Sequence, residues 1–156
     1  MIKIVRGDLL DAFNGHNAAI CHQVNCQNVM GTGVAKAIYT KWPEVKTEYH
    51  KFCEGKRPPE LLGKAQIVQL HDFPAGNKVV INIFGQAQYG HDDKRCYTRY
   101  DALAEAFDKL NAIAATKSLA FPYGFGCGLA GGDWQQVERL MLEHLWNTDV
   151  TIYMKF

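Results

Sequence analysis

Residues 18–35 read AAICHQVNCQNVMGTGVA, and this stretch decides the fold class. Its first part, Ala18 to Val24, is an almost unbroken apolar run of the kind that forms a strand buried on both faces of a sheet. The chain then passes two asparagines and two glycines and enters an expected helix over Gly33 to Lys41. A buried strand that leads through a loop into a helix is typical of α/β sheets covered on both faces.

The rest of the chain repeats this alternation. Further strands are expected over residues 2–5, 64–70, 78–84, 119–121 and 150–154, and further helices over residues 43–53, 98–116 and 133–145. Pro43 suits a first helical position, and Asp133 with Gln136 has the pattern of a capping box. Residues 54–63 read as a surface loop inside one domain. The pattern predicts a mixed or parallel sheet between helices, with ligands bound at the carboxyl ends of its strands.

Length and charge limit the possible partners. The 156 residues fit one domain, and the net charge of +1 gives no broad basic surface for duplex nucleic acid. Neither a basic leader followed by an apolar run nor a stretch of roughly 20 apolar residues is present, so no membrane or export is expected. We therefore expect a soluble, cytoplasmic protein whose anionic partner is small and held locally.

The five cysteines argue against several kinds of site. They are odd in number and have no paired C-x-x-C spacing, so reduced and mostly buried thiols are expected, as in intracellular proteins. No cysteine is followed six residues later by arginine, which excludes the cysteine-phosphatase loop. The segment His91-Asp92-Asp93 reads as a solvated loop, and neither a metal nor a cofactor is expected.

A second glycine loop follows the fifth expected strand. Residues 121–134 read FPYGFGCGLAGGDW and place five of the fourteen glycines within nine positions. Glycines allow several backbone amides to point into one concavity, and both loops lead into helix N-termini that favour negative charge. For a single glycine, a tight turn is the simpler explanation, but five together favour an anion site. The third glycine of a Rossmann fingerprint is replaced by Lys36, and no Walker sequence occurs.

Typical interaction free energies indicate what kind of anion the two loops can hold. A helix N-terminus contributes about 0.3–1 kcal/mol, whereas micromolar binding needs about 8 kcal/mol. Hydrogen bonds to a charged group contribute roughly 1.5–3 kcal/mol each, so several amides from both loops are required. Two facing loops suit a pyrophosphate better than a single phosphate.

Three segments together resemble the macrodomain family of ADP-ribose binders. They are Val5-Arg6-Gly7-Asp8-Leu9, the segment from Val24-Asn25-Cys26 to Gly31-x-Gly33-Val34-Ala35, and the glycine loop that ends in Gly132-Asp133-Trp134. The likeness spans almost the whole chain and is strongest to the small stand-alone branch, which includes the yeast-type ADP-ribose 1″-phosphate phosphatase and single-domain ADP-ribosyl glycohydrolases. It implies one macrodomain over residues 1–156, with a three-layer α/β/α fold and a mixed, mostly parallel six-stranded sheet.

The resemblance also implies which residues bind ADP-ribose. They are Asp8, Leu9, Asn25, Gly31, Thr32, Gly33, Val34, Gln86, Gly124, Phe125, Gly126, Cys127, Gly128, Leu129 and Tyr153. Asp8 would accept a hydrogen bond from the adenine amino group, or would only cap a helix. Tyr153 would wall the base pocket, or would only pack in the core. Asn25 would bind the distal ribose hydroxyls, or would form an Asx turn at the strand end.

Two residues, His22 and Asn25, are the candidates for catalysis. A similarly placed histidine in the yeast-type phosphatase implies acid–base work by His22, whose ordinary pKa near 6.5 permits either role. His22 also shares strand parity with Ile20 and Val24, which is the pattern of a core histidine. Both interpretations of His22 stay open.

The chain departs from the glycohydrolase branch at two places. Members of that branch share a lysine just after the fourth strand and an acidic residue after the Cys-Gly-Leu of the second loop. Here Gly85-Gln86 and Ala130 occupy these places, and Lys94 lies farther along in a loop. Gln86 and Tyr89 are candidate contacts with the distal ribose, or spacers.

These residues lead to one primary hypothesis and several alternatives. The primary hypothesis is a metal-independent phosphatase acting on ADP-ribose 1″-phosphate. Hydrolysis of O-acetyl-ADP-ribose or of an ADP-ribosyl ester is the second possibility. A non-catalytic reader of ADP-ribose or ADP-ribosylated macromolecules is the third, and an NAD-dependent oxidoreductase is disfavoured by the missing fingerprint.

Overall fold

The structure is a computed structural model that describes residues 2–15, 17–73, 77–90, 92, 94–113 and 118–155. Its strands are β1 (Ile2–Arg6), β2 (Ala19–Asn25), β3 (Ala65–Gln69), β4 (Val79–Gln86), β5 (Ser118–Pro122) and β6 (Asp149–Met154). They form one sheet in the order β1-β6-β5-β2-β4-β3. All neighbouring strands are parallel except β3 and β4, which are antiparallel. The predicted mixed, mostly parallel six-stranded sheet is confirmed.

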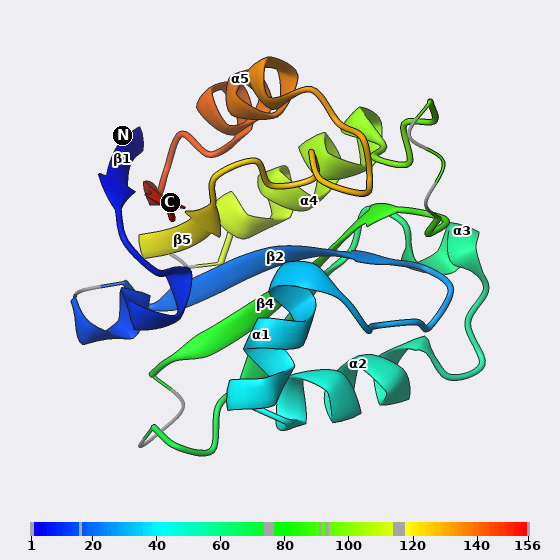
Figure 1. The fold of residues 1–156 in the computed structure, drawn as a ribbon, viewed down its shortest axis with the longest axis horizontal. Coiled ribbons are helices and arrows are strands. Elements are labelled where there is room, and N and C mark those ends of the chain that lie inside the picture. The colour runs from blue at the N-terminus through cyan, green and yellow to red at the C-terminus, as the bar shows by residue number, and fades with distance from the viewer. Residues whose placement is uncertain are drawn as a thin grey trace.

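Helices cover both faces of this sheet. The helical elements are the 3-10 helix η1 (Leu9–Asn14), α1 (Gly33–Lys41), α2 (Glu44–Cys53), α3 (Pro58–Leu61), α4 (Tyr100–Asn111) and α5 (Trp134–His144). Figure 1 shows α4 and α5 on one side of the sheet and α1 and α2 on the other. The predicted three-layer α/β/α arrangement is therefore confirmed.

The alternation of side chains along β2 explains why two layers of helices form. Ala19 and Cys21 belong to a core cluster with Phe107 of α4. Ile20, between them, belongs to a separate cluster with Ile38 of α1. Because successive strand residues point to opposite faces, an apolar run at the sheet centre needs a helical cover on each side.

Three local predictions are corrected by the structure. Residues 54–63 contain α3, because Pro58 suits the first turn of a helix. Pro43 caps α2 instead of starting it. The capping box is wrong: Asp133 does cap α5 by accepting from the Gln135 amide (3.0 Å), but its own amide donates to the Tyr100 hydroxyl (2.9 Å) and not to Gln136.

The remaining expectations concern α4, the membrane and the cysteines. The helix predicted to reach residue 116 ends at Asn111, and residues 114–117 lie outside the described part, as do His91 and Asp93 of the predicted solvated loop. In the described ranges, no helix has the length and apolar character needed to cross a membrane. Cys21, Cys26 and Cys53 are buried free thiols, while Cys96 is exposed.

Candidate functional site

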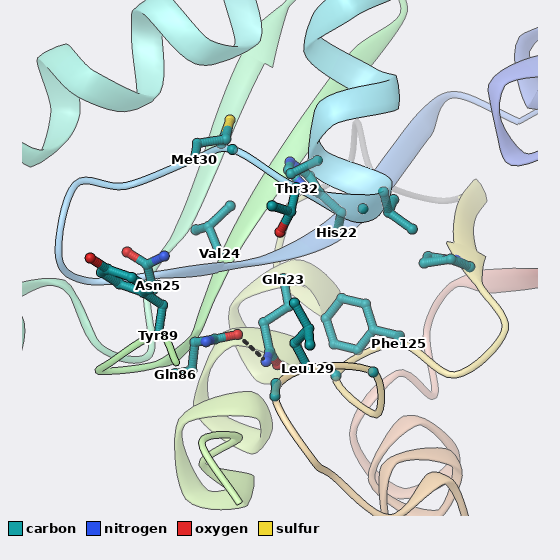
Figure 2. Close-up of a pocket in the computed structure, with 18 of the residues that line it drawn as sticks. His22, Gln23, Val24, Asn25, Met30, Thr32, Gln86, Tyr89, Phe125 and Leu129 are labelled. Atoms are coloured by element: carbon teal, nitrogen blue, oxygen red, sulfur yellow. Dashed lines mark hydrogen bonds between the residues drawn. The ribbon is translucent and has the colours of Figure 1, made fainter. Parts of the chain in front are cut away.

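A cavity of about 580 Å³ lies where β2, β4 and β5 end, between the two glycine-containing loops. From the first loop it is lined by Asn25, Val29, Met30, Gly31, Thr32, Gly33, Val34 and Ala35. From the second loop it is lined by Tyr123, Gly124, Phe125, Gly126, Gly128, Leu129 and Ala130. Figure 2 shows Met30 and Thr32 on one side and Phe125 and Leu129 on the other. This volume is within the roughly 300–1,000 Å³ typical of small-molecule sites.

The first loop presents the N-terminus of α1 to the cavity. Thr32 is the N-cap, but its side chain makes no capping hydrogen bond. Within the described part of the chain, the amides of Gly33, Val34 and Ala35 have no acceptor. Unpaired amides at a helix N-terminus, together with the helix dipole, favour an anion.

The second loop alternates amides used in turns with amides that stay open. The Cys127 amide donates to the Gly124 carbonyl (2.8 Å), and the Gly131 amide donates to the Gly128 carbonyl (3.0 Å). The amides of Gly126, which precedes Cys127, and of Gly128 and Leu129, which follow it, have no acceptor among the described residues. The loop therefore offers a second set of donors to the same cavity.

Four glycines leave open space at the cavity. A Cβ atom built on Gly31, Gly33, Gly124 or Gly128 would meet no other atom within 4 Å. Gly33 and Gly124 have positive φ angles of 62° and 77°, which by themselves favour glycine. At Gly31 and Gly128 neither packing nor the backbone conformation requires glycine, whereas a ligand that approaches the backbone does.

No charged side chain is present among the described residues that line the cavity. A bound anion would therefore be held by backbone amides and the α1 dipole, without an ion pair. Such donors are fixed by the fold, so little side-chain entropy is lost when the ligand binds.

Gln23 connects β2 to the second loop and was missed by the sequence analysis. Its Nε2 donates to Gln86 Oε1 (2.8 Å, Figure 2) and to Thr98 Oγ1 (2.9 Å). The Thr98 hydroxyl in turn donates to the Gly126 carbonyl (2.6 Å). A polar residue inside an apolar strand was the available signal, but its partners come from distant segments. Tyr123, which lines the cavity and packs on Trp134, was also missed.

Asn25 shapes the first loop with its own side chain. Its Oδ1 accepts from the Gln27 amide (2.9 Å), and its Nδ2 donates to the Val29 carbonyl (2.7 Å). The Tyr49 hydroxyl of α2 donates to the Asn25 carbonyl (2.8 Å). This is the Asx turn that the sequence left open as an alternative. Asn25 also lies on the cavity wall beside Gln86 and Tyr89, so its contact with a distal ribose stays a prediction.

Replacing Tyr49 by phenylalanine should destabilise this loop. Tyr49 is completely buried, so Tyr49→Phe leaves the Asn25 carbonyl without its donor. A buried group left unpaired costs about 1–3 kcal/mol, and we expect that loss in the free energy of unfolding measured by urea denaturation. Tyr39→Phe is the control, since no described hydrogen bond uses the Tyr39 hydroxyl. Equal stabilities of the two variants would contradict the assignment.

His22 is buried on the α1 and α2 side of β2 and is also part of the cavity wall. Its Nε2 lies 2.5 Å from Oδ1 of Asn82, and its Nδ1 has no hydrogen-bond partner in the described structure. Burial lowers the pKa of His22 to about 4, only partly opposed by the bond to Asn82. The imidazole is therefore neutral at pH 7 and cannot act as a general acid there.

This pKa predicts how stability depends on pH. In the unfolded chain His22 takes up a proton below about pH 6.5, whereas the folded protein resists protonation until about pH 4. The free energy of unfolding should therefore fall by about 3 kcal/mol as the pH drops across this window. The reference is His22→Gln, which keeps a donor for Asn82 and does not titrate. If urea denaturation gives parallel pH profiles for both proteins, the lowered pKa is wrong.

Four of the predicted ligand residues do not line the cavity: Asp8, Leu9, Cys127 and Tyr153. Asp8 caps η1, and the hydrogen bond from the Leu10 amide (2.9 Å) holds the pKa of Asp8 below its ordinary value. The Tyr153 hydroxyl donates to Asn17 Oδ1 (2.9 Å). Cys127 lines a second cavity of about 280 Å³. The adenine-binding roles of Asp8 and Tyr153 stay predictions.

An α/β/α sandwich with two amide-lined loops at its strand ends defines a class of α/β proteins that bind anionic ligands there. A family model described as Macro domain matches residues 21–141, and the chain belongs to this family.

Similar proteins of known sequence or structure agree with this. The chain is 32% identical over 158 residues to the DNA ADP-ribosyl glycohydrolase of Mycobacterium tuberculosis, covering 98% of this chain and 42% of that protein. It is 44% identical over 62 residues to the ADP-ribose 1″-phosphate phosphatase of Aspergillus oryzae, covering 39% and 30%. It thus spans less than half the length of these relatives. A Bacteroides thetaiotaomicron protein of unknown function superposes with a TM-score of 0.83 at 26% identity, covering 99% of this chain and 98% of that one.

Proposed function

We propose that the protein binds ADP-ribose with the pyrophosphate between the two loops. The observation that carries this proposal is the set of open amides on both sides of one cavity, at Gly33, Val34, Gly126 and Leu129. Four hydrogen bonds to a charged group, at roughly 1.5–3 kcal/mol each, reach the 8 kcal/mol of a micromolar complex. A single helix N-terminus does not.

The reaction that we propose is hydrolysis of ADP-ribose 1″-phosphate. The oxygen of a water molecule attacks the phosphorus, the bond from phosphorus to the ribose O1″ breaks, and O1″ takes up a proton given up by the water, so that ADP-ribose and inorganic phosphate result. His22 supports this reaction because its imidazole is neutral and its Nδ1, which is buried in the ligand-free structure, has no partner among the described residues and can accept a hydrogen bond from that water once the water reaches it. The phosphatase name of the Aspergillus oryzae relative supports the same substrate.

Calorimetry and a phosphate-release assay test the two parts separately. ADP-ribose should bind, and adenosine should bind far more weakly because it has no pyrophosphate. Wild type should release phosphate from ADP-ribose 1″-phosphate, and His22→Ala should lose most of that activity while it keeps affinity for ADP-ribose. No turnover by wild type, or equal turnover by both proteins, would defeat the phosphatase proposal. Binding without turnover of any substrate would leave a reader of ADP-ribose.

A glycohydrolase is the second candidate, because the relative named DNA ADP-ribosyl glycohydrolase aligns with almost the whole chain. Gln86 and Ala130 argue against a glycohydrolase, since they occupy the two positions where members of that branch share a lysine and an acidic residue. Release of ADP-ribose from ADP-ribosylated DNA, under conditions where no phosphate is released from ADP-ribose 1″-phosphate, would favour this candidate over the phosphatase.

A further inference from the structure

A row of buried polar side chains crosses three strands beneath α2. His22 of β2, Asn82 of β4 and Gln66 of β3 are partners in the sheet register. Their exposed fractions are 2%, 0% and 8%, and the next residues on the same face of the sheet are the buried apolar Ile20, Val80 and Val68. Burying three polar side chains together is costly unless they are hydrogen-bonded to one another.

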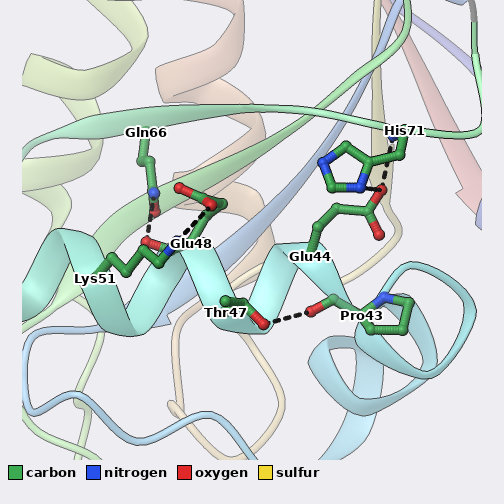
Figure 3. A network of polar contacts seen from close by, with 7 residues as sticks. All are labelled: Pro43, Glu44, Thr47, Glu48, Lys51, Gln66 and His71. Atoms are coloured by element: carbon green, nitrogen blue, oxygen red, sulfur yellow. Dashed lines mark hydrogen bonds and ion pairs between the residues drawn. The ribbon is translucent and has the colours of Figure 1, made fainter.

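These side chains form a continuous chain of hydrogen bonds that ends on α2. Gln66 Nε2 donates to the backbone carbonyl of Glu48 (2.9 Å), as Figure 3 shows. Asn82 Nδ2 donates to Gln66 Oε1 (3.0 Å). Asn82 Oδ1 then lies 2.5 Å from Nε2 of His22.

Which group donates in each of these hydrogen bonds follows from the backbone carbonyl of Glu48, at which the chain of bonds ends. A backbone carbonyl has no proton, so Gln66 must turn its NH₂ group toward Glu48 and its oxygen toward Asn82. Asn82 must then turn its NH₂ group toward Gln66 and its oxygen toward His22. An amide oxygen only accepts, so Nε2 of the neutral imidazole must carry the hydrogen. The other ring nitrogen, Nδ1, is left with its lone pair.

We propose that Asn82 and Gln66 are positioning residues that hold His22 as the Nε2–H tautomer, so that Nδ1 serves as a hydrogen-bond acceptor for the water that attacks the substrate. The assignment to the attacking water rests on the proposed function, whereas the tautomer follows from the hydrogen-bond chain alone. Nδ1 fits this role because it has no hydrogen-bond partner in the described structure and because His22 is part of the cavity wall. This nitrogen is closed to solvent in the ligand-free structure, so the role requires that water reaches it when the substrate is bound. A catalytic histidine is commonly oriented in this way by a hydrogen bond at its other nitrogen.

No competing charge acts on His22 from the part of the chain that the structure describes. The influences on its pKa are its burial and the hydrogen bond with Asn82, and no charged side chain of the described elements packed around it contributes. Changing the charge at Asn82 should therefore act directly on the imidazole.

Nitrogen-15 NMR of the imidazole in the wild-type, ligand-free protein tests the tautomer. The spectrum should show His22 neutral at pH 7, with the hydrogen on Nε2 and none on Nδ1. A hydrogen on Nδ1, or a charged ring, would overturn the proposal. This measurement needs no substitution and no activity, so it separates failure of the inference from failure of the proposed function.

Asn82→Asp tests the link to the reaction. A carboxylate beside Nε2 favours the imidazolium, so the pKa of His22 should rise by at least one unit. The acidic limb of the pH profile for phosphate release should move upward by the same amount, which is about a tenfold loss of turnover per unit within that limb. Gln69→Glu is the matched control, because it adds the same charge at an exposed position of β3 and should move neither quantity.

The outcomes separate the possible failures. A raised pKa of His22 with an unmoved pH profile would overturn the positioning role and leave the phosphatase intact. Absence of wild-type turnover would overturn the role toward water and the phosphatase together, while the NMR result would still decide the tautomer. If Asn82→Asp does not fold, Gln66→Leu is the second variant, because it breaks the chain of hydrogen bonds without adding a charge. In this variant His22 should be a mixture of its two neutral tautomers. An unchanged Nε2–H tautomer would overturn the proposal.

Discussion

Gly31→Val should weaken ADP-ribose binding about a hundredfold and leave the stability of the protein unchanged. A side chain at this position would meet no protein atom within 4 Å, and no positive φ at Gly31 disfavours valine. The valine would instead occupy the cavity beside the N-terminus of α1, where the pyrophosphate is proposed to lie. Loss of one or two hydrogen bonds to a charged group, at roughly 1.5–3 kcal/mol each, corresponds to an effect of this size.

Calorimetry with ADP-ribose and thermal unfolding of the ligand-free protein measure the two parts of this expectation. Gly15→Val is the control, because Gly15 is exposed at the end of η1, away from the cavity, and its added Cβ would make only an ordinary contact. Unchanged affinity in Gly31→Val would place the ligand elsewhere. A large drop in its melting temperature would mean that packing explains this glycine.

The fold was predictable wherever one strand or helix carries its own pattern. The apolar run of β2 and the residue pattern of α1 predicted the bounds of these two elements to within one residue. A strand buried on both faces and a helix buried along one stripe each leave a local pattern in the sequence. The 3-10 helix η1 was foreseen only as the alternative in which Asp8 caps a helix, because six residues, with Leu9, Ala12 and Phe13 buried, are too few for a distinct helical pattern. Tertiary packing on the sheet, in the cluster with Ile20, holds it instead.

The site was predictable as two glycine loops but not as a set of contacts. The spacing of the glycines indicated which backbone segments approach a ligand, since glycine has no side chain to prevent that approach. The partners of His22 were invisible, because Asn82 lies 60 residues away and Gln66 a further 16 residues from Asn82. Only the strand register brings the three together, and register between distant strands cannot be deduced from one sequence.

The second loop is anchored to the core by aromatic rings. Phe125 lies in this loop and is 2% exposed. Its ring contacts Phe121 of β5 edge to face at 5.2 Å between centroids, and Phe107 of α4 at 6.2 Å. Phe107 also meets Phe121 at 5.8 Å. Because the same loop carries the open amides of Gly126 and Leu129, packing of these rings should determine how well the amides are aligned.

Phe107→Ala should therefore lower both stability and affinity. Removing a fully buried phenylalanine costs about 3–5 kcal/mol, which urea denaturation will measure as a loss in the free energy of unfolding. The cavity left beneath Phe125 should let the loop shift, so ADP-ribose affinity should fall by about tenfold in the protein that remains folded. Leu110→Ala is the matched control, since it removes a buried side chain of α4 one turn farther along. If both variants lose similar stability but only Leu110→Ala keeps normal affinity for ADP-ribose, the aromatic cluster aligns the loop. Equal affinities in the two variants would mean that the loop holds its shape without Phe107.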